Sequence, residues 1–106
     1  MGVLMNTEIE NKIKELKEIV SMRTSLEKLY KNRGFIKVIS EGYFDSEPVR
    51  LTMIRPMVKA EYQSNIDDAF KAVGLLNKYL EVVMSNGEQA QNEIDKLEAE
   101  LNPTEE

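Results

Sequence analysis

The side chains in this sequence that could do chemistry are mainly carboxylates. Glu61, Asp67 and Asp68 lie close together in the chain, and Asp45 and Glu47 could join them in space. Paired carboxylates can bind a divalent cation or act as general acid and base. Their spacing is not that of a calcium-binding loop, and the chain has no histidine or cysteine to complete a metal or nucleophile site. Since acidic residues also favour the first turn of a helix, we expect no catalytic residue, metal, cofactor or small-molecule substrate.

A second set of side chains combines basic and aromatic residues. Bases can contact phosphates and aromatic rings can stack on nucleotides, so such a set could bind nucleic acid. Glu27 and Glu41 interrupt the patch, however, and the whole chain carries a net charge of −5. We interpret the set as a solvated helix end and do not expect nucleic acid as a partner. Its members are Lys28, Lys31, Arg33 and Lys37, with Tyr30 and Phe35 among them.

The strongest pattern in the sequence is a heptad repeat in its C-terminal part. Small or apolar residues alternate at steps of three and four for about five heptads, more than a coiled coil requires. They are Ile66, Ala69, Val73, Leu76, Leu80, Val83, Gly87, Ala90, Ile94, Leu97 and Leu101, which we call the seam. The pattern predicts a long helix over residues 60–101. A bend is expected at Gly87, because glycine is unfavourable within a helix and has no side chain to pack.

An earlier helix is predicted over residues 7–33. Gly34 follows it as the left-handed residue that commonly ends a helix. This helix is shorter than the C-terminal one and cannot cover the whole seam. Ile94, Leu97 and Leu101 should therefore need a partner outside the chain, and a second copy related by a twofold axis is the simplest partner.

The central segment, residues 35–57, supports two interpretations. Residues 49–53 alternate apolar and polar side chains as a half-buried strand does, which would give a β-hairpin. The same segment can form short helices, with Pro48 in a tolerated first turn and a helix end before Pro56. We favour the helices. The expected fold is mainly α: a single domain forming a helical hairpin or small bundle, with a long heptad C-terminal helix and an acidic tail over residues 102–106.

Composition indicates where the chain works and what it contacts. No apolar run is long enough for a membrane helix, the first residues do not resemble a secretion signal, and cysteine is absent, so a cytoplasmic location without membrane contact is expected. Acidic residues dominate from Glu88 onward, where Lys96 is the single base, and this favours solubility or a basic protein surface as partner. The candidate partner surface comprises Phe35, Tyr43, Phe44, Glu93, Glu98 and Glu100.

Two stretches resemble segments of small accessory proteins of tailed bacteriophages. One is Phe35–Arg55, with the element EGYF at residues 41–44, and the other is Ala72–Ala90, followed by a glutamate-rich helix. The resemblance implies a largely helical, phage-encoded protein in the host cytoplasm or the virion, with no catalytic residues to transfer. Pro48 and Pro56 depart from the more helix-friendly pattern of that group. The order of helix, central hairpin and heptad helix is also similar to the plan of a prefoldin-type chaperone subunit, as an architectural analogy.

Together these features predict a non-enzymatic helical oligomerisation or adaptor protein. It would act in virion structure or assembly, and a coiled-coil seam would join it to protein partners, first of all to its own copies. The alternative is a small acidic inhibitor or regulator that binds a host enzyme or nucleic-acid-binding protein by imitating nucleic acid. Salt distinguishes the two, because binding by an acidic mimic weakens steeply with ionic strength, whereas apolar association persists.

Overall fold

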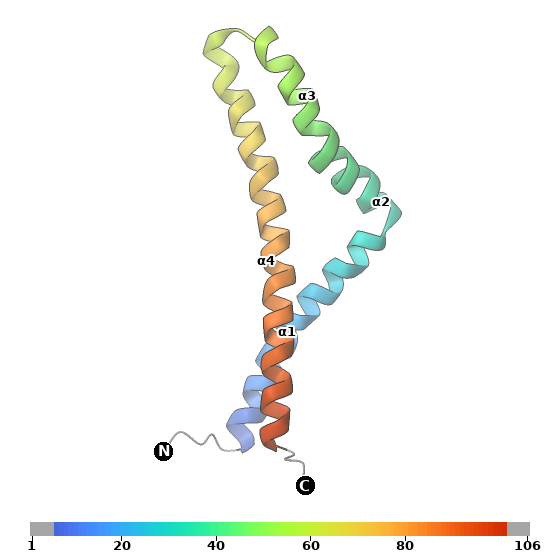
Figure 1. The fold of residues 1–106 in the computed structure, drawn as a ribbon, viewed down its shortest axis with the longest axis vertical. Coiled ribbons are helices and arrows are strands. Elements are labelled where there is room, and N and C mark those ends of the chain that lie inside the picture. The colour runs from blue at the N-terminus through green and yellow to red at the C-terminus, as the bar shows by residue number, and fades with distance from the viewer. Residues whose placement is uncertain (1–5, 102–106) are drawn as a thin grey trace. The chain divides into compact units, whose positions relative to one another are not determined.

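A computed structural model describes residues 6–101, and every regular element among them is a helix (Figure 1). The mainly α fold class is therefore confirmed, and the β-hairpin interpretation of residues 35–57 is wrong. The chain divides into two compact units. Unit 1 comprises Met1–Leu26 with Val82–Glu106, and unit 2 comprises Glu27–Glu81. The acidic tail predicted at 102–106 and the N-terminal residues 1–5 lie outside the described residues.

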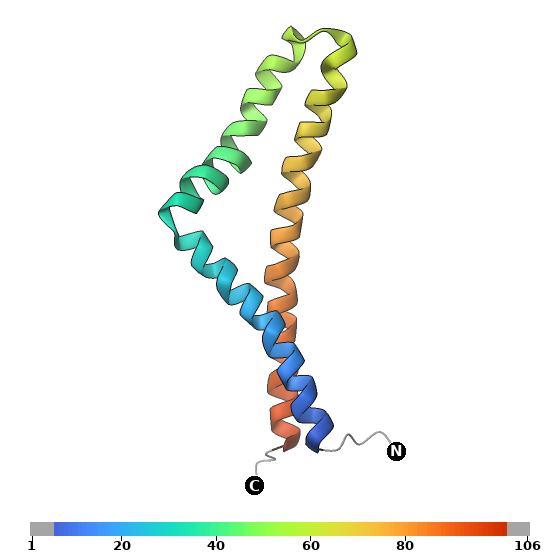
Figure 2. The same ribbon diagram turned by 180° about the vertical axis from the view of Figure 1, so that it is seen from behind.

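Unit 1 is a pair of helices. It consists of the first part of α1 (Asn6–Lys31) and the last part of α4 (Gln63–Leu101), which lie against each other in both ribbon views (Figures 1 and 2). Apolar residues one helical turn apart on each helix form the contact, as expected for an amphipathic pair. The buried core consists of Ile9, Ile13, Leu16, Ala90, Ile94 and Leu97, with Val20 and Leu101 packed against it.

The long C-terminal helix is present and continuous. α4 runs from Gln63 to Leu101 without a break at Gly87, which is buried. Gly87 therefore does not interrupt the helix. Its missing side chain lets α1 approach α4 closely, because the nearest atoms to a Cβ at this position belong to Arg23.

Unit 2 begins at Glu27, inside α1, and α1 ends at Lys31 rather than at residue 33. Asn32 has an extended backbone and accepts a hydrogen bond through Oδ1 from the amide of Phe35, at 3.0 Å, so it caps the short helix α2 (Arg33–Phe35). Gly34 lies inside α2, and no described glycine has a positive φ. The prediction that Gly34 ends the first helix in a left-handed conformation is therefore wrong, because the side chain of Asn32 makes the turn.

The next element, η1 (Ile36–Ser46), is an 11-residue π-helix. Its hydrogen bonds span five residues, as in the bond from the Glu47 amide to the Gly42 carbonyl, so each turn holds more than four residues. Half-buried Ile39, Tyr43 and Glu47 precede buried Leu51 at a constant spacing of four.

The chain then reverses direction within unit 2. α3 (Glu47–Ile54), η2 (Arg55–Met57) and η3 (Ala60–Tyr62) lead into the first part of α4, which runs opposite to α3 (Figure 1). The side-chain Nε2 of Gln63 donates to the carbonyls of Arg55 and Val58, at 3.2 Å each, and holds this reversal. Pro48 and Pro56 stand near the starts of α3 and η2, where a missing amide hydrogen is tolerated.

Candidate functional site

The C-terminal end of the seam is covered by the chain itself. Ile94 is 2% exposed and Leu97 8%, and both belong to one core with Ile9 and Ile13 of α1. Leu101 packs against the same core. The prediction that these three residues need a partner outside the chain is wrong. The physical reason is the position of α1, whose first half lies along the end of α4 instead of along its beginning.

The rest of the seam also faces inward. Val73 and Ala90 are buried, and Ile66, Leu76, Leu80 and Val83 are half-buried. No described seam residue is exposed, so the heptad phase identified the inward face of α4 along its full length. Self-association through the seam stays a prediction, and it no longer has an exposed apolar end to support it.

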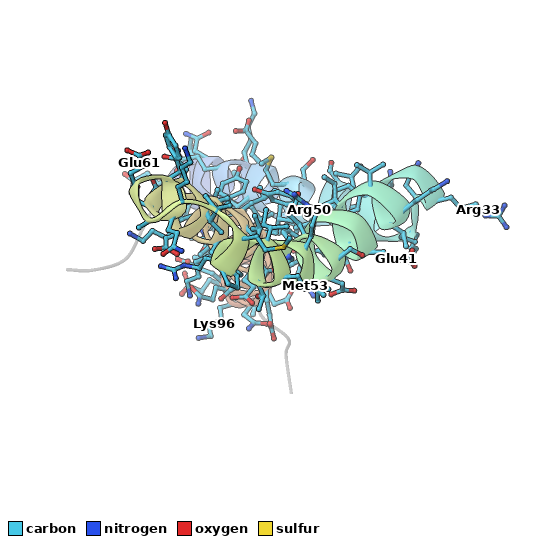
Figure 3. The ribbon with its side chains drawn as sticks, turned by 90° about the horizontal axis from the view of Figure 1, so that it is seen from above. Arg33, Glu41, Arg50, Met53, Glu61 and Lys96 are labelled. Carbon is cyan, nitrogen blue, oxygen red and sulfur yellow. The ribbon has the colours of Figure 1, made fainter. Side chains whose placement is uncertain are left out.

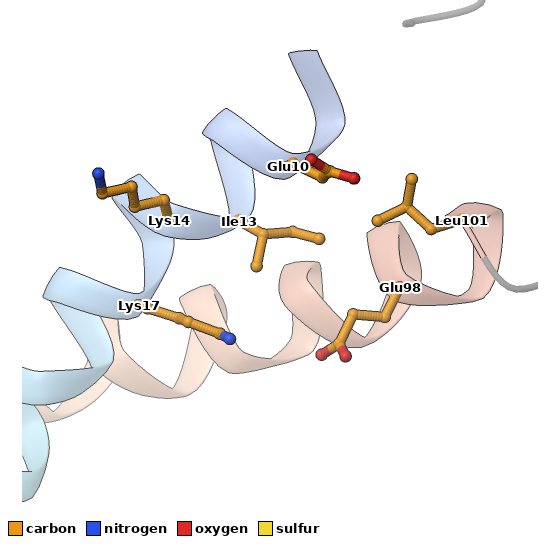
Figure 4. Close-up of a pocket in the computed structure, with 6 residues that line it drawn as sticks. All are labelled: Glu10, Ile13, Lys14, Lys17, Glu98 and Leu101. Atoms are coloured by element: carbon orange, nitrogen blue, oxygen red, sulfur yellow. The ribbon is translucent and has the colours of Figure 1, made fainter. Parts of the chain in front are cut away.

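The surface of unit 1 carries a shallow open groove between its two helices. Figure 4 shows Ile13 directed towards α4 at the floor and Lys14 directed away from it. The remaining lining residues are Glu10, Lys17, Glu98 and Leu101. Among the described residues no polar or charged side chain is buried. The groove therefore offers no desolvated group that could bind a ligand specifically or act as an acid or base.

The predicted acidic and basic sets do not form a common site. Arg33 and Glu61 lie at opposite ends of unit 2 (Figure 3), and Asp67 is paired with Arg55. Asp67 accepts hydrogen bonds from Arg55 Nε at 2.8 Å and Nη2 at 3.1 Å. The hydrogen bond from Arg55 lowers the pKa of Asp67 below its ordinary value, and the pKa of Arg55 is raised. Within residues 6–101, no cluster of three or more acidic side chains could hold a metal ion.

The predicted partner surface falls into two parts. Phe35, Tyr43 and Phe44 are half-buried in unit 2, where Phe35 contacts the ring of Tyr30 edge-on with centroids 5.8 Å apart. Tyr43 and Phe44 form a second ring pair, with centroids 5.9 Å apart. These rings are therefore partly occupied within unit 2. The acidic members Glu93, Glu98 and Glu100 are exposed on α4 in unit 1.

Sequence reasoning missed an exposed apolar surface of unit 2. Val49, Met53 and Met57 are 60%, 69% and 83% exposed, and we call them the α3 face (Met53 is labelled in Figure 3). The strand interpretation grouped Val49 and Met53 with Leu51, whereas the helix buries Leu51 and turns the other two outward. The spacing of four between Val49 and Met53 was the available signal, since it places these two residues on one side of α3.

Two further findings limit what can be inferred about the function of the chain. None of the helices in the described part of the chain is long and apolar enough to cross a membrane. Comparison with protein-family models, curated proteins and solved structures gives no match. The functional argument therefore rests on the chain's own surfaces.

Proposed function

We propose that this chain is a non-enzymatic helical oligomerisation and adaptor protein whose contact surface is the α3 face. The supporting observation is the exposure of Val49, Met53 and Met57, which follow one another at a spacing of four along α3 and η2 and are each at least 60% accessible. Contiguous exposed apolar side chains are typical of protein interaction sites. Fully covering one such side chain contributes roughly 1.5–3 kcal/mol, so the three together can hold a partner.

The chemistry of the α3 face favours a protein helix as its occupant. Two of its three residues are methionines, whose unbranched, flexible side chains adapt to different apolar surfaces. A helical partner would present apolar residues at the same spacing of three and four. Neither a small molecule nor a metal ion would use such a flat apolar row, because both need converging polar groups.

The charges beside the α3 face favour a second copy of the chain. Arg50 is paired with Glu47, and Arg55 is paired with Asp67, so both arginines near the face are already neutralised. A twofold interface brings the same residues of both copies together and is disfavoured when they carry unpaired like charges. Closed twofold dimers are also the commonest soluble oligomers.

The place of action follows from the resemblance to tailed-phage accessory proteins. On that basis the protein is phage-encoded, works in the host cytoplasm or the virion, and serves virion structure or assembly as an oligomer that joins other proteins. The resemblance alone supports this part of the proposal.

A second candidate function rests on a different observation. Glu93, Glu98 and Glu100 are exposed on α4, and Lys96 is the one base in this part of the chain. An acidic helix of this kind could bind a basic host protein and inhibit it by imitating nucleic acid. Its binding would fall steeply with salt, whereas association through the α3 face would not.

Sedimentation equilibrium of two matched variants tests the proposed surface. Met53→Ser removes an apolar side chain from the α3 face, and Met22→Ser removes one that is 53% exposed on α1 in unit 1. Met53→Ser should weaken self-association at least tenfold, while Met22→Ser should leave it unchanged. Equal association in both variants would show that the α3 face is not the contact surface.

A further inference from the structure

One stretch of unit 2 carries basic charges only. Residues 28–40 contain four bases and no acid, and we call this stretch the basic segment. It covers the last turn of α1, the short helix α2 and the start of η1. All four charged side chains are exposed, and Figure 3 shows that of Arg33 directed away from the ribbon. The four bases are Lys28, Lys31, Arg33 and Lys37.

One stretch of unit 1 carries mainly the opposite charge. Residues 93–101, at the end of α4, contain four exposed acids and one base, and we call this stretch the acidic segment. The acids are Glu93, Asp95, Glu98 and Glu100, and the base is Lys96. Within residues 6–101, no ion pair involves any of these acids or any base of the basic segment. The charges of both segments are therefore available to a partner.

The core of unit 1 keeps the acidic segment near the start of α1. Ile94 and Leu97, which belong to this segment, share the buried core with α1 residues that end at Leu16. The basic segment begins at Lys28, 12 residues after Leu16 in the same continuous helix, a separation of about 18 Å at 1.5 Å per residue. Two side chains do not span this distance. An acidic partner for Lys28 and Lys31 must therefore come from outside the chain.

A second copy of the chain supplies a matching partner. Its acidic segment offers four acids to four bases, and it is present wherever the chain is. Nucleic acid is the other polyanion that a basic segment could bind, through phosphate contacts and stacked bases. The rings that stacking would use are engaged with each other, because Tyr30 contacts Phe35 edge-on with centroids 5.8 Å apart. Charge complementarity therefore favours the second copy.

We propose that copies of this chain associate head to tail, with the basic segment of one copy against the acidic segment of the next. Because the contact joins two different surfaces, each copy in it keeps one segment free for a further copy. Such a heterologous contact closes into a ring or grows into a filament. The contact itself does not depend on the α3 face. Only its combined effect rests on the proposed function: the α3 face would join copies in pairs, and the charged segments would join the pairs.

Salt should control this contact. A single exposed ion pair contributes little to stability, so several pairs must act together. The screening length falls from about 30 Å at 0.01 M salt to about 3 Å at 1 M. The oligomer should therefore grow at low salt, and at high salt it should shrink to the species that the α3 face holds together.

Exchange of charge between two variants tests the contact. One variant reverses three bases of the basic segment, and the other reverses three acids of the acidic segment. Each variant alone carries like charges on both segments, so sedimentation velocity should show no growth in mass at low salt. An equal mixture should regain that growth, because each segment again finds one of opposite charge. The substitutions are Lys31→Glu, Arg33→Glu and Lys37→Glu in the first variant, and Glu93→Lys, Glu98→Lys and Glu100→Lys in the second.

A matched control separates the contact from net charge. Lys59, Lys71 and Lys78 are exposed bases of unit 2 outside the basic segment, and changing all three to glutamate alters the net charge as much as the first variant does. This control should keep the growth at low salt. If a charge reversal prevents folding, glutamine at the same positions replaces it. Glutamine in the basic segment should weaken low-salt association several-fold, and glutamine at the control positions should not.

Carbodiimide cross-linking identifies the contact directly. The reagent takes up the water lost when a lysine amine and a carboxylate condense to an amide, and this happens only between groups in contact. In a mixture of isotopically labelled and unlabelled chains, cross-linked peptides that carry both isotope patterns come from two copies. Such mixed peptides should join Lys28, Lys31 or Lys37 to residues 93–101.

Three results would overturn the proposal. One is low-salt growth that survives in both folded variants, and another is growth that the mixture fails to restore. The third is a single-chain mass at low salt together with binding of a DNA oligonucleotide that the first variant abolishes, which would assign the basic segment to nucleic acid. A failure of the α3 face is distinguishable, because it appears at high salt as a single-chain mass and leaves the low-salt growth in place.

Discussion

The side chain of Arg23 lies directly on the backbone of Gly87. A Cβ added to Gly87 would stand 2.3 Å from Arg23 Cβ and 2.9 Å from its Cγ, distances at which real atoms cannot remain. These are the inner atoms of the arginine, so a simple swing of the guanidinium would not relieve the contact. Gly87 therefore sets how closely the two helices of unit 1 approach.

Gly87→Ala should destabilise unit 1. Replacing an exposed helical glycine by alanine normally stabilises a helix by about 0.5–1 kcal/mol, so the sign of the effect is the test. We expect the overpacked variant to lose about 1–3 kcal/mol of unfolding free energy, measured by urea denaturation. Gly74→Ala, with nothing within 4 Å of its Cβ, should instead gain stability. A gain in both variants would mean that Arg23 does not constrain Gly87.

Ile94→Ala should destabilise the chain strongly. Ile94 is 2% exposed in the core that joins α1 to α4. Its truncation leaves a cavity and should lower the free energy of unfolding by about 2–5 kcal/mol. Ile19→Ala is the matched control, because Ile19 is 40% exposed on α1 and should cost less than about 1 kcal/mol. Thermal unfolding of the two variants measures the difference. Equal melting temperatures would show that Ile94 is not buried by α1.

Acid should release the ion pair that joins η2 to α4. The hydrogen bond from Arg55 holds the pKa of Asp67 below its ordinary value, so the pair stabilises the fold at neutral pH. This contribution is lost as the pH falls through the lowered pKa. An NMR titration should find the depressed pKa of Asp67, and Arg55→Gln should return it towards the ordinary range. Arg50→Gln, which removes the partner of Glu47, should not change it.

The inward face of α4 could be predicted from the sequence. Heptad spacing from Ile66 to Leu101 depends only on the helix period, and every described member of the seam is buried or half-buried. What covers each part of that face could not be predicted. The end at Ile94 and Leu97 is covered by α1, and nothing in the spacing of either helix encodes that pairing.

The central segment shows why the candidate surface was harder to predict. Val49, Leu51 and Met53 share a face only in a strand, so the exposed α3 face becomes visible only once the helix is known. The π-helix is a second obstacle, because the spacing of its apolar residues Ile39 and Tyr43 also fits an α-helix and carries no signal for the wider helix. The close approach of Arg23 to Gly87 depends on tertiary packing and leaves no local signal.

Solution mass by light scattering, across protein concentration and at low and high salt, tests the proposed function most directly. Association through the apolar α3 face predicts a dimer or larger oligomer that forms with concentration and persists at high salt, since buried apolar area is not screened. A single-chain mass at every concentration would contradict self-association. An oligomer that dissociates at high salt would instead place the contact on charged residues and contradict the proposal that the α3 face is the contact surface.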